Sequence, residues 1–189
     1  MIQKLIVVLV ILYKVATVYG VENIAGESAK ILSQNNTTSQ KEQNDYSVID
    51  INKKKNAIIK VLSRNNSPLL SSVDSFINTC QKYELYCYLL PSIVALESTY
   101  GKNVLLGSNN PFGWGGGRIV FESWDKAIDT VGAGLRNNYI NKGANSIEQI
   151  GFIYAESPTW ASRVRGFINM YQMVENEEEL IYSGYKLSL

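Results

Sequence analysis

The side chains that could do chemistry are restricted by one absence, because the chain of 189 residues contains no histidine. Ser-His-Asp hydrolases, Cys-His peptidases and His-ligated metal sites all need that residue, so these classes are excluded. Carboxylates, hydroxyl groups, amides, Lys, Arg and two cysteines remain. Any chemistry of this chain must use these groups, and we expect no metal ion and no cofactor.

One carboxylate lies at an unusual position in a predicted helix. A helix over residues 86–100 would place Glu97 inside its apolar arc. Burial penalises the charged form of a carboxyl group, and a carboxyl group that keeps its proton near neutral pH can act as a general acid. Two other interpretations remain open. Glu97 could form a salt bridge with Lys102 or Arg118, or it could lie at the rim of the helix and reach water.

The segment after this helix is rich in glycine and asparagine, which is typical of a loop that lets a ligand approach the backbone. Trp114 lies in this loop, and an aromatic ring with a polar edge suits stacking on a sugar ring. Tyr154 and Trp160 offer similar surfaces further along the chain. Trp160 and Trp124 also fit apolar helical stripes, so a place in the core is open for both. The pattern indicates a groove beside Glu97.

Helical periodicity dominates from about residue 50 onward and predicts a mainly α fold. The alternating, β-branched run over residues 118–122 predicts one short strand, as half of a β-hairpin. Serines suited to begin helices precede four of the predicted helices: Ser71 or Ser72, Ser123, Ser146 and Ser157.

The two cysteines, Cys80 and Cys87, are seven residues apart. In one straight helix they would be about 10 Å apart along the axis, too far for a disulfide. We expect two buried thiols. A turn near residues 83–85 is the alternative, and it would allow a disulfide.

The ends of the chain differ from its middle. Residues 1–20 combine Lys4 with an apolar run and small residues before a cut after Gly20, which predicts an export signal. An uncleaved anchor is the alternative, with residues 5–19 as a membrane tether. The composition of residues 21–49 predicts a disordered polar linker, and residues 173–189 are predicted to form a C-terminal tail. We expect a secreted or cell-envelope protein, membrane-anchored if the signal is retained.

Five blocks of sequence, in this order and spacing, resemble one family. They are SPL at residues 67–69, LPSIVALESTYGK at 90–102, NPFGWG at 110–115, FESW at 121–124 and YAESPTWA at 154–161. Together they resemble the bacterial endo-β-N-acetylglucosaminidase domain of the lysozyme-like superfamily, over residues 50–172. The resemblance implies a mainly α, lysozyme-like helical domain with a small β-hairpin element. Relatives often have an Asp at the start of the catalytic helix, where this chain has Tyr86.

The resemblance also implies an activity and a site. Family members cleave β-1,4 linkages of peptidoglycan, and the Glu-Ser-x-x-Gly segment makes Glu97 the implied general acid. Tyr154 resembles the tyrosine that often lines the cleft. Asn110 and Phe112, which lie in the NPFGWG block, join Trp114, Tyr154 and Trp160 as the expected substrate-binding residues.

A second carboxylate is harder to assign. Retaining glycosidases set two carboxyl groups about 5 Å apart and inverting ones about 6.5–9.5 Å apart, whereas substrate-assisted and transglycosylase routes need only the acid. Glu122, beyond the glycine-rich loop, is the predicted partner. It could equally be a solvated acid or pair with Arg118. Asp125 lies in the first turn of a helix, where an acid suits the helix dipole.

Three functions remain in competition: a peptidoglycan hydrolase, a lytic transglycosylase of the same fold, and a non-catalytic protein that binds cell-wall glycan. The formal net charge of +1 gives no reason to expect nucleic-acid binding. We expect a monomer whose partner is the glycan strand of peptidoglycan.

Overall fold

The computed structural model describes residues 47–186, with side chains described through residue 177. These residues are mainly helical, as predicted, and contain no strand. A first helix spans residues 47–64. It is followed by η1 (Pro68–Ser72), α3 (Val73–Lys82), α4 (Leu89–Ser98), α5 (Trp124–Asn138), η2 (Ile140–Lys142), α6 (Ile147–Tyr154) and α7 (Trp160–Lys186). The helices from Asp50 onward belong to one compact unit, Asp50–Leu189.

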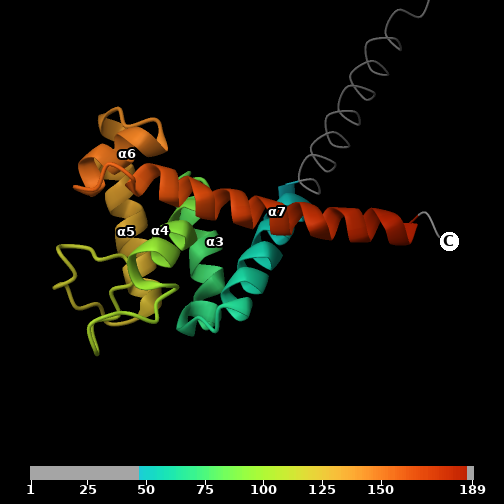
Figure 1. The fold of residues 1–189 in the computed structure, drawn as a ribbon, viewed down its shortest axis with the longest axis horizontal. Coiled ribbons are helices and arrows are strands. Elements are labelled where there is room, and N and C mark those ends of the chain that lie inside the picture. Colours follow the sequence, from blue (N-terminus) through green and yellow to red (C-terminus); the bar gives the residue numbers. More distant parts are fainter. Residues whose placement is uncertain (1–46, 187–189) are drawn as a thin grey trace, which may run out of the picture. The chain divides into compact units, whose positions relative to one another are not determined.

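The core forms where the helices cross. α4 and α6 both pack against α7, and α3 packs against α5 (Figure 1). α4 is buried along most of its length, which explains why its sequence is apolar on nearly every side. Gly132 of α5 allows the close approach to α3, because a β-carbon there would lie 2.2 Å from Thr79 Cγ2. This packing fixes α4, and the end of α4 carries Glu97.

Serine caps set the starts of two helices as predicted. The Ser123 side chain accepts from the Lys126 N–H at the start of α5, and Ser146 accepts from the Gln149 N–H at the start of α6. The prediction of a cap at Ser71 or Ser72 is wrong, since Ser72 makes no side-chain cap. The 3-10 turn η1 precedes α3 instead, and Ser67 caps that turn through the Leu69 N–H.

The predicted strand over residues 118–122 is not formed, and the described residues contain no β-hairpin. These residues lie in a long loop between α4 and α5. Glycines at 115–117 have positive φ and send the chain through consecutive turns, and the segment that returns beside residues 108–110 forms no strand ladder with them. The Phe121 N–H donates to the Ser108 carbonyl, an isolated backbone bond where a strand would have a ladder.

The prediction of two free thiols is wrong, because Cys80 and Cys87 form a disulfide with a Cα–Cα distance of 4.9 Å. The straight-helix assumption fails here. α3 ends at Lys82, Glu84 adopts a positive φ of 48°, and α4 begins only at Leu89. The chain therefore turns back between the two cysteines, as the alternative required. Arg136 of α5 holds this turn by donating to the Tyr83 carbonyl.

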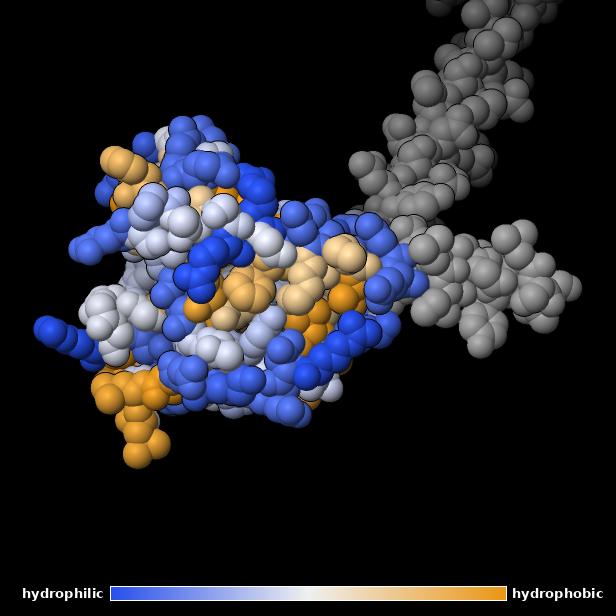
Figure 2. All heavy atoms as spheres, in the orientation of Figure 1, coloured by the Kyte–Doolittle hydropathy of each residue, from blue (hydrophilic) through white to orange (hydrophobic). Residues whose placement is uncertain are grey.

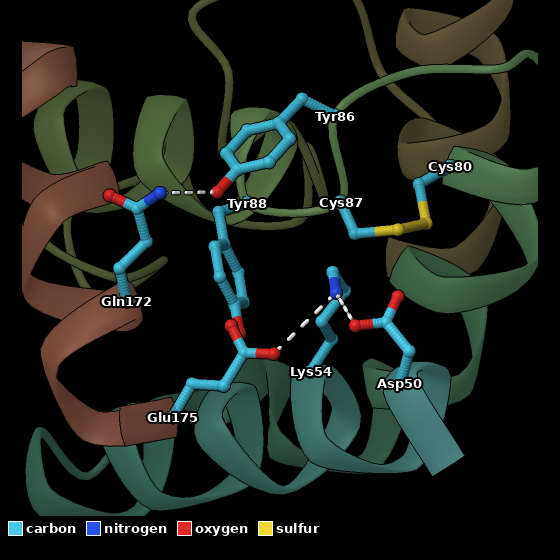
Figure 3. A network of polar contacts seen from close by, with 8 residues as sticks. All are labelled: Asp50, Lys54, Cys80, Tyr86, Cys87, Tyr88, Gln172 and Glu175. Atoms are coloured by element: carbon cyan, nitrogen blue, oxygen red, sulfur yellow. Dashed lines mark hydrogen bonds and ion pairs between the residues drawn. A yellow bond between two sulfur atoms is a disulfide. The ribbon is translucent and has the colours of Figure 1, made fainter. Parts of the chain in front are cut away.

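A polar network beside the disulfide ties α7 to the first helix and to the turn before α4 (Figure 3). The Tyr88 hydroxyl, on the residue before α4, donates to Glu175 at 2.7 Å, and Lys54 lies 3.5 Å from the same carboxylate and also pairs with Asp50. Burial, followed by the contact with Glu175, raises the pKa of Tyr88, so its hydroxyl stays protonated.

The helices at both ends of the folded body extend past the predicted domain boundaries. α7 continues through residue 172 to Lys186, and Val174 is buried, so residues 173–177 are part of the folded body and not a separate tail. At the other end, residues 47–49 are helical, although they fall inside the predicted linker. The export signal, the tether over residues 5–19 and the rest of the linker lie outside the described residues. Within residues 47–186, no helix is long and apolar enough to cross a membrane.

Candidate active site

Glu97 lies in the last turn of α4 and its side chain is exposed. The interpretation that buries it in the apolar arc is wrong, and the interpretation that places it at the rim of the helix holds. α4 ends one residue later, and Thr99 and Tyr100 both adopt left-handed backbone angles, so the chain turns away and leaves this face open. The indole N–H of Trp160, the first residue of α7, donates to Glu97 Oε1 at 2.7 Å.

Aromatic side chains surround this hydrogen bond. The ring of Tyr154, the last residue of α6, stacks on Trp160 with centroids 4.9 Å apart and lies 5.7 Å from the Trp114 ring. Tyr139 extends the group, 6.3 Å from both Trp114 and Tyr154. These four rings are called the aromatic cluster below. Three of them were predicted from the sequence. Tyr139 was missed because its position after α5 carries no sequence signal.

Tyr154 joins three parts of the site. Its hydroxyl donates to the Phe112 carbonyl at 2.8 Å, its ring stacks on Trp160, and α6 carries its backbone. Burial raises the pKa of Tyr154 well above its ordinary value, with a further rise from the charge of Glu97 and then of Tyr139. Tyr154 therefore keeps its proton near neutral pH and acts as a hydrogen-bond donor, which rules it out as a base there.

Two predicted substrate contacts, Asn110 and Phe112, turn inward and shape the loop. The Asn110 side chain donates to the carbonyls of Trp114 and Ile119 and accepts from the Trp114 N–H. Its amide is thus occupied by loop backbone, and the residue is buried. The Phe112 side chain is fully buried, and its carbonyl holds Tyr154. Neither side chain is free to contact a ligand directly, so both act by positioning the loop.

The glycine-rich loop comes close to the acid at Gly113. This residue has a φ of +63°, and a β-carbon built there would lie 3.6 Å from Glu97 Oε2. A glycine therefore faces the carboxylate oxygen that Trp160 does not bind. The loop backbone at Gly113 lies near Oε2, and Trp160 of the aromatic cluster binds Oε1.

Glu122 is exposed in the bend before α5, and its side chain makes no hydrogen bond or ion pair with other described residues. It does not pair with Arg118. Within the described part of the chain, no second acidic side chain shares a hydrogen-bond partner with Glu97. The same part of the chain contains no group of three or more acidic or cysteine side chains suited to a metal ion. Asp125 lies in the first turn of α5, as predicted.

Trp114 depends on a glycine in α5 that the sequence analysis did not single out. A β-carbon at Gly134 would lie 2.7 Å from Trp114 Cζ2, so the indole can rest on the helix only because position 134 has no side chain. A glycine inside a helix costs about 1 kcal/mol relative to alanine. Gly134 thus lowers the stability of α5 and lets Trp114 reach the aromatic cluster.

This arrangement predicts the effect of Gly134→Ala. We expect an unchanged or higher melting temperature from the better helix propensity, together with displacement of Trp114 and several-fold weaker binding to purified cell-wall glycan. Pull-down on insoluble glycan and near-ultraviolet circular dichroism measure the two effects. Gly166→Ala in α7 is the matched control, because a β-carbon there meets no atom within 4 Å. Equal glycan binding by both variants would contradict the assigned role of Trp114.

Comparison with known proteins leaves the family of this chain undetermined, since no protein-family model and no curated protein matches its sequence. The geometry of the site is therefore the basis for a function. One exposed carboxyl group lies at a helix end and accepts a hydrogen bond from an indole N–H, with a glycine-rich loop and a cluster of aromatic rings nearby.

Proposed function

We propose that this chain is an exported peptidoglycan hydrolase that cleaves β-1,4 glycosidic bonds of the glycan strand, with Glu97 as the general acid. The observation that carries the proposal is the placement of Glu97. Its carboxyl group is accessible, one oxygen is held by Trp160 at 2.7 Å, and the aromatic cluster lies beside it. Aromatic faces suit sugar rings, and an acid next to them can protonate the leaving oxygen.

The sequence supports the same function independently. The five blocks that resemble the endo-β-N-acetylglucosaminidase domain contain Glu97, Trp114, Tyr154 and Trp160, and these four residues come together in space. Chance similarity in separate blocks gives no reason for their side chains to meet. Glu97 is the exposed group here, and Trp114 and Tyr154 beside it are partly exposed aromatic rings, a composition suited to a carbohydrate.

Lytic transglycosylation is the second candidate, and one observation favours it. Among the described residues, Glu97 shares no hydrogen-bond partner with another carboxylate, and Glu122 lies unpaired in its bend. A transglycosylase needs only the acid, because a hydroxyl group of the sugar itself attacks, and substrate-assisted hydrolysis has the same requirement. Hydrolysis with Glu122 as the second carboxylate remains part of the first proposal.

The place of action follows from the proposed substrate. Peptidoglycan lies outside the cytoplasmic membrane, and the export signal predicted over residues 1–20 would take the chain there. We propose a monomer that acts in the cell envelope or after secretion, with residues 5–19 as a tether if the signal is retained. On the face that Figure 2 shows, hydrophobic residues project at separate points and also form a patch among hydrophilic residues.

Product analysis tests the function and separates the candidates. Purified peptidoglycan is digested with the protein, and the fragments are identified by mass spectrometry. We expect fragments with reducing N-acetylglucosamine ends. Ends of 1,6-anhydro-muramic acid would identify a transglycosylase. Binding to the wall without release of any fragment would refute both enzymatic proposals and identify a glycan-binding protein.

A further inference from the structure

We infer that Trp160 is a positioning residue for Glu97, which binds Oε1 of the carboxyl group and thereby reserves Oε2 as the oxygen that carries and delivers the proton. This inference rests on the proposed function and deepens it, because it assigns the two oxygens of the acid to different tasks. It also reassigns Trp160, which the sequence had suggested as a sugar contact.

The fixed position of the indole supports this role. Trp160 is only 3 % exposed, so its ring offers little surface to a ligand. Two residues of α6 contact the ring: Tyr154 stacks on it with centroids 4.9 Å apart, and a β-carbon at Gly151 would lie 2.8 Å from Trp160 Cε3. An indole that is packed so closely holds its N–H in one direction, and that direction is toward Glu97.

The chemistry of the donor decides which oxygen carries the proton. An indole N–H donates and cannot accept, so the oxygen it binds must present a lone pair. The carbonyl oxygen of a carboxylic acid accepts better than its hydroxyl oxygen, so the Trp160 N–H at 2.7 Å from Oε1 favours the proton on Oε2. Oε2 faces Gly113, where the missing side chain leaves space next to the oxygen.

The same hydrogen bond gains strength as the reaction proceeds. The O–H bond at Oε2 breaks as the bridging sugar oxygen takes the proton, and the electron pair of the glycosidic C–O bond stays with that oxygen, which leaves as a hydroxyl group. A water molecule forms the new bond to the anomeric carbon and loses its proton to solvent, and Glu97 is left as a carboxylate. A hydrogen bond to an ionised acceptor is about twice as strong as one to a neutral acceptor. Trp160 thus stabilises the charge that develops on Glu97, which is an interaction that lowers the barrier and not only the energy of the bound substrate.

Few other groups can disturb this pair. From α6, Tyr154 faces Glu97, and it stays neutral because burial raises its pKa. From α7, Trp160 faces it and does not titrate, and the loop presents the backbone of Gly113. No described Lys or Arg pairs with Glu97, so the state of its carboxyl group is reported directly by the indole that binds it.

A nuclear magnetic resonance titration of the folded chain tests the pair without reference to activity. The chain has three tryptophans, hence three indole N–H resonances, which substitution by Phe assigns one at a time. We expect the Trp160 resonance to move with pH as Glu97 ionises and to lose this movement in Glu97→Gln, while the Trp114 resonance stays constant. A Trp160 resonance that behaves alike in both proteins would overturn the inference.

Kinetics with Trp160→Phe test the consequence for catalysis. This variant keeps an aromatic ring at position 160 but removes the N–H together with the five-membered ring of the indole. On a soluble glycan fragment we expect kcat to fall about 10-fold or more with KM within about twofold. The alkaline limb of the pH–rate profile should move to higher pH, because the donor that favours the ionised acid is gone. Trp124→Phe, in the first turn of α5, is the matched control and should change neither quantity.

The outcomes separate this inference from the proposed function. An unchanged kcat and pH–rate profile in Trp160→Phe would refute the positioning role while leaving hydrolysis intact. A chain without any hydrolytic activity, whose Trp160 resonance still follows Glu97, would refute the proposed function and retain the pair. If Trp160→Phe does not fold, the spectra of the wild type and Glu97→Gln decide the matter.

Discussion

The Glu97→Gln variant is expected to lose about 10²- to 10⁴-fold in the rate of glycan cleavage, the usual contribution of a general acid. Gln has nearly the same size as Glu and can still accept the Trp160 N–H, so the packing around it should persist. What it lacks is an acidic proton for the leaving oxygen. Release of reducing ends from peptidoglycan measures the loss, and thermal unfolding followed by circular dichroism shows that the fold is retained.

Two further substitutions make this result specific. Glu177→Gln changes an exposed acid of α7 in the same way and should leave the rate unchanged. Glu122→Gln tests the predicted second carboxylate: a loss similar to that of Glu97→Gln would give hydrolysis its partner acid, and a normal rate would point to a route that needs only one acid. Wild-type cleavage by a folded Glu97→Gln protein would remove the proposed mechanism.

Loss of the Cys80–Cys87 disulfide is expected to lower the free energy of unfolding by about 2–3 kcal/mol, the value for a short closed loop in the chain-entropy description. The bond closes a turn whose ends are seven residues apart, and this turn sets the start of α4. Chemical denaturation of the Cys80→Ser/Cys87→Ser variant, compared with the wild type, measures the difference.

The control for this experiment is the effect of a reducing agent. Dithiothreitol should lower the stability of the wild type toward that of the double variant and leave the double variant unchanged. Equal denaturation midpoints for the oxidised wild type and the double variant would show that the bond adds no stability. Because the disulfide lies at the start of α4 and Glu97 at its end, the double variant should also show a lower temperature of half-inactivation.

The sequence predicts the helices well because their signals are local. Ser123 and Ser146 cap their own helices, and the apolar spacing of α5 and α7 needs no knowledge of the partner helix. The failed strand has the opposite cause. Its β-branched residues favour an extended backbone, but a strand also needs a neighbour, and the glycines before it direct the chain elsewhere.

The site could be predicted only where one residue carries the signal by itself. Glu97 was found as an acid among apolar neighbours, although its exposure depends on where α4 ends. The roles of Asn110, Gly134 and Tyr139 depend on contacts between distant segments, which periodicity does not encode. The disulfide was missed for the same reason, because a turn between its two cysteines decides whether they meet.

The two contacts of Tyr154 couple the glycine-rich loop to Trp160. The Tyr154 hydroxyl group donates to the Phe112 carbonyl of the loop and its ring stacks on Trp160, so the loop and the start of α7 are linked through one side chain. A sugar that presses on Trp114 would pass its displacement through Tyr154 to the indole that steadies Glu97. If the proposed function holds, binding of a sugar at Trp114 and the orientation of Glu97 would therefore be coupled through Tyr154.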